Sequence, residues 1–64
     1  MCESTAFVLE GTEERLFLKD VVRISPLASG KLLVENLLGD QREFEGTIAE
    51  IDFMSHKIVL ARRG

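Results

Sequence analysis

Turn-forming residues divide this chain into short segments, and this division constrains the fold more than any other feature of the sequence. The segments are rich in valine, isoleucine, leucine and phenylalanine, which favour extended structure, and they recur roughly every ten residues. We expect strands over residues 4–10, 15–19, 21–25, 31–36, 41–45, 47–52 and 57–61. The sequence therefore predicts an all-β fold: a small antiparallel β-barrel, SH3-like or Sm-like, of six to seven short strands in a single domain, residues 1–64.

Individual residues set the expected strand ends. Asp20 separates the second strand from the third, and Pro26 ends the third because its nitrogen cannot donate to a sheet ladder. Gly46 is typical of a bulge or a tight bend between two strands. Residues 53–56 are expected to form the last turn before the final strand.

One segment also fits a helix. Phe44, Ile48 and Ile51 recur at helical spacing, so an amphipathic helix over residues 41–53 is the main alternative. We retain the strands as the prediction for this region.

The chain is short for a stable domain. A domain of about its 64 residues buries only ~60% of the surface of the unfolded chain, and usually depends on disulfides, a metal or a partner subunit. Its hydrophobic fraction of 45% is sufficient for a core and too high for a disordered chain. Because one cysteine cannot form an internal disulfide, a metal ion or a homodimer is expected to supply stability.

Charge and composition argue against several functions. The net charge of −3 and the pI near 5.0 disfavour binding of nucleic acid, which depends on basic surface. No apolar run approaches the ~18 residues of a membrane span, and the first residues lack the layout of a signal peptide. Phosphate-binding glycine motifs are absent, and so short a chain leaves little room for a catalytic pocket. We therefore expect a non-enzymatic protein of the cytoplasm, where its free thiol stays reduced.

The most reactive groups of the sequence lie at its start. Cys2 is the only cysteine, and one peptide bond separates it from Met1, which carries the α-amine. An inert buried thiol is the simplest interpretation of a lone cysteine, although a chain end is rarely buried. A catalytic thiol needs a histidine base, and nothing in the sequence places His56, the only histidine, near Cys2. If Cys2 is functional, metal binding is favoured over catalysis.

The donors at this end favour a particular kind of metal ion. A thiolate, an amine and the intervening peptide nitrogen close tight chelate rings, which suit square-planar Ni(II) or Cu(II). Zinc prefers tetrahedral sites that usually contain paired cysteines, which this chain lacks. One chain supplies too few donors, so we expect a homodimer that shares one metal on its two-fold axis. If Met1 is removed, the ligands from each chain would be the amine and the thiolate of Cys2. If Met1 is retained, its amine and the Cys2 amide nitrogen would join the thiolate, and the sequence leaves both possibilities open.

Other polar residues carry weaker signals. His56 is interpreted as a solvated turn residue, and the acidic residues between positions 43 and 52 as a solvated surface. Two other classes of function remain as alternatives. A binding module for RNA or protein, with an incidental thiol, would use a groove near Lys57, Arg62 and Arg63. A redox sensor would instead form an intermolecular disulfide through Cys2.

Several stretches of the sequence resemble the CooT family. They are Met1-Cys2-Glu3-Ser4-Thr5-Ala6, Lys19-Asp20-Val21-Val22-Arg23-Ile24, Glu45-Gly46-Thr47-Ile48-Ala49-Glu50-Ile51-Asp52 and His56-Lys57-Ile58-Val59-Leu60. This family consists of small nickel-binding accessory proteins associated with maturation of carbon monoxide dehydrogenase. The resemblance implies an all-β homodimer that binds Ni(II) through Cys2. It also implies a metallochaperone, not an enzyme, with carbon monoxide dehydrogenase as its client.

Overall fold

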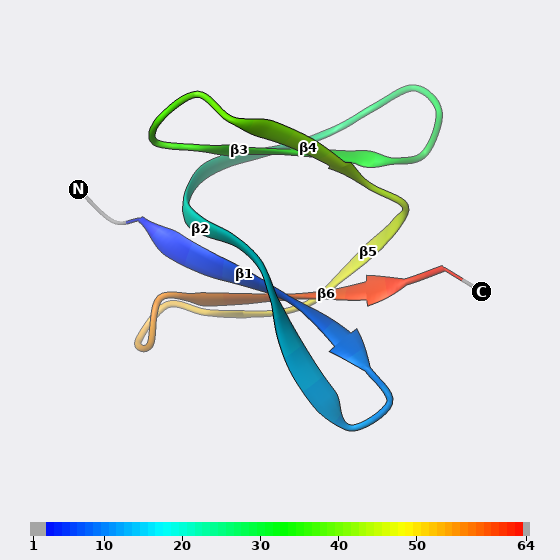
Figure 1. Cartoon of the computed structure of the whole chain (residues 1–64). Coiled ribbons are helices and arrows are strands. Elements are labelled where there is room, and N and C mark those ends of the chain that lie inside the picture. The colour runs from blue at the N-terminus through cyan, green and yellow to red at the C-terminus, as the bar shows by residue number, and fades with distance from the viewer. Residues whose placement is uncertain (1–2, 64) are drawn as a thin grey trace.

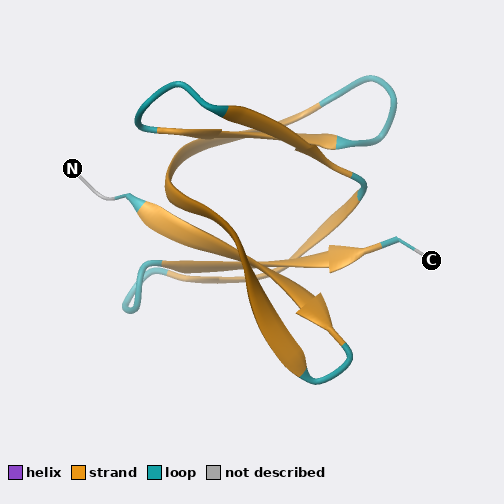
Figure 2. Cartoon of the chain, in the orientation of Figure 1, coloured by secondary structure: helices purple, strands orange, loops and turns teal. Residues whose placement is uncertain are grey.

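A computed structural model describes residues 3–63, which form six strands and the turns between them, without a helix. The strands are β1 (Ser4–Glu10), β2 (Glu13–Pro26), β3 (Leu32–Asn36), β4 (Gln41–Phe44), β5 (Gly46–Asp52) and β6 (Lys57–Arg62). They form one sheet in the order β4-β3-β2-β1-β6-β5, which curls into a half-barrel (Figure 1, Figure 2). The predicted all-β, barrel-like fold is confirmed. The alternative helix over residues 41–53 is wrong, because β4 and β5 occupy most of that stretch.

β1 lies between β2 and β6 in the sheet. It pairs with β2 as an antiparallel hairpin through the turn at Gly11, whose φ of 65° suits a glycine. Its pairing with β6 is parallel and runs from Thr5–Lys57 to Leu9–Ala61. The remaining strand pairs among residues 3–63 are antiparallel, as the sequence predicts. β6 differs because the chain crosses from β4 to β5 before it returns beside β1 (Figure 1).

β2 is one strand of 14 residues, whereas the sequence predicts two strands separated at Asp20. Asp20 does bend the backbone, since its φ of 57° is left-handed, but the strand continues through it. The pairing of β2 with β1 changes register there, between Ala6–Leu18 and Ser4–Val21. The first part of β2 therefore pairs with β1 and the second part with β3, which starts the curl of the sheet.

The hydrophobic core lies inside the curl. β1 contributes alternate residues to it, Ala6 and Val8, as the two-residue period of a strand requires. Phe44 of β4 contacts Phe17 of β2 edge to face, with ring centroids 5.4 Å apart. The buried cluster consists of Ala6, Val8, Val21, Val34, Phe44, Ile58 and Leu60. Burial of each larger apolar side chain contributes about 1.5–3 kcal/mol, so this small core supports a domain of modest stability.

The curl closes at Gly46, where the chain passes from β4 at one edge of the sheet to β5 at the other. A Cβ atom at this position would lie 2.1 Å from the Ala61 carbonyl oxygen and 2.5 Å from the Phe44 ring. The Arg63 N–H also donates to the Glu45 carbonyl oxygen at 3.3 Å, which extends the β5–β6 pairing up to the bend. The tight bend predicted at Gly46 is confirmed, and its cause is the close approach of β6.

The half-barrel has two distinct ends. The β3–β4 and β5–β6 turns lie at the end where β1 begins, which we call the N-terminal end (Figure 1). Two backbone hydrogen bonds hold these turns in place. The Leu37 N–H donates to the Asp20 carbonyl oxygen, and the Thr5 N–H donates to the His56 carbonyl oxygen. The β1–β2 and β2–β3 turns lie at the opposite end, together with the end of β6 (Figure 1). Residues 3–63 include no helix long and apolar enough to span a membrane.

Candidate functional site

The predicted metal ligands Met1 and Cys2 lie outside the described residues, so the structure locates the segment that follows them. Ser4 starts β1 opposite Val21 of β2. The Thr5 N–H donates to the His56 carbonyl oxygen at 2.9 Å, which ties the start of β1 to the β5–β6 turn. The strand that leads away from Cys2 is therefore held on both sides.

An apolar groove lies beside Ser4 at the N-terminal end. It has a volume of about 300 Å³ and is lined by Ser4, Val21, Val22, Arg23, Ile24, Ile48, Ile51, Phe53 and Ile58. Large side chains are exposed along it, since Phe53 is 81% exposed, Ile51 46% and Val22 45%. Met54, in the adjacent turn, is 93% exposed. A gathering of exposed apolar side chains on so small a protein indicates an interaction site.

The β5–β6 turn uses His56 for its backbone. The φ of His56 is 53°, which is left-handed, and its carbonyl oxygen accepts the hydrogen bond that holds β1. Asp52 caps the same turn, accepting hydrogen bonds from the Met54 and Ser55 N–H groups at 3.0 and 3.3 Å. The Ser55 hydroxyl and these N–H groups hold the pKa of the Asp52 carboxyl below its ordinary value. The predicted last turn is confirmed, and His56 has a conformational role in it.

The acidic residues between positions 43 and 52 are spread over β4 and β5. The Glu43 carboxylate lies 3.8 Å from the Lys31 ammonium, and Asp52 caps the turn described above. Within residues 3–63, no group of three or more histidine, cysteine, aspartate and glutamate side chains is arranged to hold a metal ion.

Lys57 and Arg62, which the binding-module alternative places near one groove, lie at the two ends of β6. Lys57 begins β6 and Arg62 ends it, and the strand between them spans roughly 17 Å. The Lys57 ammonium lies 2.8 Å from the Glu14 carboxylate, which raises the pKa of Lys57. Arg62 lies 3.4 Å from the Glu10 carboxylate at the opposite end of the half-barrel. Residues that are close in the sequence are thus separated by the extended backbone of β6.

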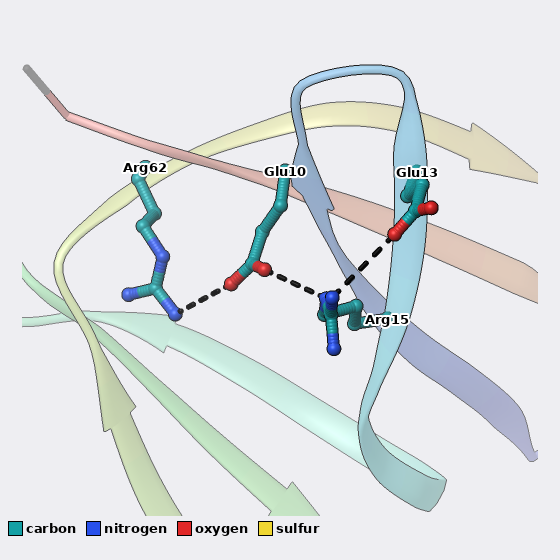
Figure 3. Close-up of polar contacts among 4 residues, drawn as sticks. All are labelled: Glu10, Glu13, Arg15 and Arg62. Atoms are coloured by element: carbon teal, nitrogen blue, oxygen red, sulfur yellow. Dashed lines mark hydrogen bonds and ion pairs between the residues drawn. The ribbon is translucent and has the colours of Figure 1, made fainter.

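A charged cleft, which the sequence does not predict, lies at the end opposite the apolar groove. It has a volume of about 460 Å³ and is lined by Val8, Glu10, Arg15, Leu16, Phe17, Lys31, Arg42, Glu43, Phe44, Glu45 and Arg62. Figure 3 shows one part of it, where Glu10 lies between Arg15 and Arg62. The lining residues come from strands far apart in the sequence, so no local motif identifies the cleft.

These features define a small single-sheet β-protein with two surface sites, an apolar groove beside the start of β1 and a charged cleft at the other end. This chain belongs to the CooT family, since the model of the CO dehydrogenase accessory protein CooT matches residues 1–61. The family resemblance seen in the sequence is confirmed.

Similar proteins include one with a crystal structure and one known from its sequence. A crystal structure ascribed to CooT from Carboxydothermus hydrogenoformans superposes with a TM-score of 0.90 at 35% sequence identity, covering 98% of this chain and 100% of that one. An uncharacterized protein of Archaeoglobus fulgidus is 42% identical over 43 residues, which make up 67% of this chain and 93% of the relative. The structural similarity therefore extends over nearly the whole half-barrel.

Proposed function

We propose that this chain is a nickel-binding metallochaperone that delivers or stores Ni(II) for the maturation of carbon monoxide dehydrogenase. Membership of the CooT family supports the accessory role. The observation that carries the proposed metal site is the position of Ser4, which starts β1 and lines the apolar groove. Cys2 precedes Ser4 by two residues, so chain geometry limits the distance between their Cα atoms to about 7 Å. We therefore place the proposed nickel site next to the edge of the groove.

The chemistry of the first two residues fits this ion. A thiolate with the nitrogen donors of the Met1–Cys2 segment forms tight chelate rings, which suit square-planar Ni(II). The thiol must lose its proton to bind, so the affinity for nickel falls as the pH drops below neutrality. A thiol that must stay free also favours action in the reducing cytoplasm. The role is one of binding and transfer, without catalysis by this chain.

We propose a homodimer in which a second copy covers the apolar groove and one Ni(II) is shared by the two Cys2 thiolates. One chain has too few donors for a four-coordinate ion, and a two-fold related copy supplies the same donors again. The groove suits this contact because Val22, Ile51 and Phe53 are exposed and apolar. Removing such apolar surface from water favours association of the two copies. A metal that bridges two copies also strengthens the dimer by mass action.

A nickel titration of freshly reduced protein, followed by absorption spectroscopy, tests this function. Thiolate-to-nickel charge-transfer bands are expected to saturate at one metal per two chains, the stoichiometry of a shared two-fold site. Cys2→Ser is expected to abolish these bands and to leave the circular dichroism spectrum unchanged, because the buried core lies elsewhere.

The other outcomes of this titration separate the alternatives. Saturation at one metal per chain would retain nickel binding and exclude the shared site. No bands with nickel, zinc or copper would contradict the metal site and favour a small Sm-like module for RNA or protein with an incidental thiol. Reversible disulfide-linked dimers under mild oxidant, without metal binding, would instead indicate a redox sensor.

A further inference from the structure

The charged cleft gathers positive charge in an otherwise acidic protein. It is lined by four of the eight basic residues, Arg15, Lys31, Arg42 and Arg62, and by three of the eleven acidic residues, Glu10, Glu43 and Glu45. Its net formal charge is therefore +1, whereas that of the whole chain is −3. The lining of the cleft is thus less acidic than the chain as a whole, although its Arg15 also pairs with Glu13 at 3.5 Å.

Arg42 is the side chain best placed to hold an anion. Its guanidinium lies 4.3 Å above the Phe17 ring and donates to the Phe17 carbonyl oxygen at 2.8 Å, so its orientation is fixed. Among residues 3–63, no carboxylate forms an ion pair with it. An arginine has five N–H donors, so Arg42 keeps enough of them for a bidentate contact with a carboxylate.

Arg62 provides a second positioned guanidinium. It lies 5.6 Å from the centroid of the Phe44 ring, and that ring packs edge to face on Phe17. The two guanidinium groups therefore lie over neighbouring aromatic rings. Leu16, which is 59% exposed, and the half-buried Phe17 supply the apolar surface of the cleft, whereas Val8 and Phe44 are buried beneath it.

Glu10 demonstrates that a carboxylate fits between guanidinium groups in this cleft (Figure 3). Its oxygens lie 2.8 Å from Nε of Arg15 and 3.4 Å from a terminal nitrogen of Arg62. The Arg15 and Glu10 side chains are 65% and 41% exposed, so solvent screens this pair and it is weak. The cleft therefore accommodates one carboxylate between two guanidinium groups.

We propose that the charged cleft binds a single carboxylate attached to an apolar group. Such a ligand is presented by a polypeptide whose C-terminal residue is apolar, or by a free carboxylic acid with an aromatic or aliphatic body. The cleft volume of about 460 Å³ lies within the range of small-ligand sites. Nucleic acid and polyphosphates fit poorly, because a net charge of +1 neutralises few phosphates.

The carboxylate site does not depend on the proposed metal site. The charged cleft and the apolar groove share no lining residue, and they lie at opposite ends of the half-barrel. A homodimer formed through the groove leaves the cleft open to solvent.

Titration of the ¹⁵N-labelled protein with 3-phenylpropionate, and with a short peptide ending in phenylalanine, tests this proposal. Saturable changes in NMR chemical shift are expected for the backbone amide groups of the residues that line the cleft. Arg42→Gln is expected to weaken binding at least about tenfold, because the bidentate charged hydrogen bonds are lost. Arg63→Gln is the matched control, since Arg63 lines neither the cleft nor the groove and donates to the Gly30 carbonyl oxygen at 3.1 Å. The affinity of this variant for both ligands should equal that of the unmodified protein.

The neutral analogues decide whether charge matters. The peptide amide and 3-phenylpropanol are expected not to bind, and equal affinity for them would overturn the proposal. An equal loss in both arginine variants, or no saturable shift with either carboxylate at millimolar concentration, would also overturn it. Tighter binding of the peptide identifies a chain end as the ligand source, and tighter binding of the free acid identifies a small molecule. If Arg42→Gln does not fold, Arg62→Gln replaces it, with the same loss expected.

Discussion

Asp20 and His56 are the non-glycine residues of the described chain with positive φ, at 57° and 53°. Left-handed backbone costs a residue with a Cβ atom roughly 1–2 kcal/mol. Each of the two carbonyl groups offsets this cost by accepting a hydrogen bond from another element, Asp20 from Leu37 and His56 from Thr5. Both residues therefore join segments of the chain that surround the start of β1.

Replacing His56 by glycine separates a conformational role from a ligand role. Glycine adopts the left-handed backbone without strain and keeps the carbonyl group that accepts from Thr5. We expect His56→Gly to retain the nickel stoichiometry and affinity of the unmodified protein. His56→Ala also lacks the imidazole but keeps the strained conformation, so it should be less stable than His56→Gly by about 1 kcal/mol.

Urea denaturation and nickel titration of the two His56 variants measure these effects. Loss of nickel binding in both variants, with the fold retained, would show that the imidazole is a ligand.

At the scale of the elements, Gly46 controls how β4 passes into β5. A methyl group there would meet the backbone oxygen of Ala61, which cannot move aside as the end of a flexible side chain can. We expect Gly46→Ala to lower the free energy of unfolding by about 2–3 kcal/mol, measured by urea denaturation and circular dichroism. Gly39→Ala is the comparison for backbone strain without a clash, because the φ of 91° at Gly39 is unfavourable for alanine and the space around it is open. A loss in Gly46→Ala no larger than that in Gly39→Ala would contradict the steric role of Gly46.

The strand boundaries are largely predictable because they depend on local chemistry. Pro26 ends its strand because proline has no backbone N–H to donate to a neighbouring strand. Gly46 permits a tight bend because it has no side chain, whichever strand lies beside it. The path of β2 through Asp20 is not predictable in this way, because pairing with β1 and β3 decides whether the chain bends or breaks. The parallel pairing of β1 with β6 is equally unpredictable from local sequence. It depends on the burial of Ile58 and Leu60 of β6 in the core that β1, from the other end of the chain, also forms.

The candidate sites are predictable only where one residue carries the chemistry. Cys2 stands out as the only thiol, and its role as a nickel ligand stays a prediction because it lies outside the described residues. The apolar groove and the charged cleft arise from side chains that the fold brings together from distant strands. Lys57 and Arg62 are close in the sequence but distant in space, because the extended strand β6 separates them.

At the scale of the whole molecule, the apolar groove determines the proposed assembly. Ile51 lines the groove and is 46% exposed, and a charge at this position would be removed from water in the proposed dimer. We expect Ile51→Lys to raise the dimer dissociation constant at least about tenfold, measured by sedimentation velocity with and without nickel. It should also remove the stoichiometry of one metal per two chains.

Leu16→Lys is the matched control for this prediction. Leu16 is a large apolar residue with 59% exposure, and it lies outside the groove. Its dimerisation should equal that of the unmodified protein. An effect confined to Leu16→Lys would place the interface at the other end of the half-barrel.

The parallel pairing of β1 with β6 also determines when the chain can fold during synthesis. β1 leaves the ribosome before the other strands, yet Ala6 pairs with Ile58, 52 residues later in the sequence. Until β6 emerges, one edge of β1 has no hydrogen-bonding partner, and its bond from Thr5 to His56 cannot form. The segment that follows Cys2 is thus synthesised early, but it acquires its full set of hydrogen bonds only late in synthesis. A nascent chain can hold its start in place only after translation has passed β6.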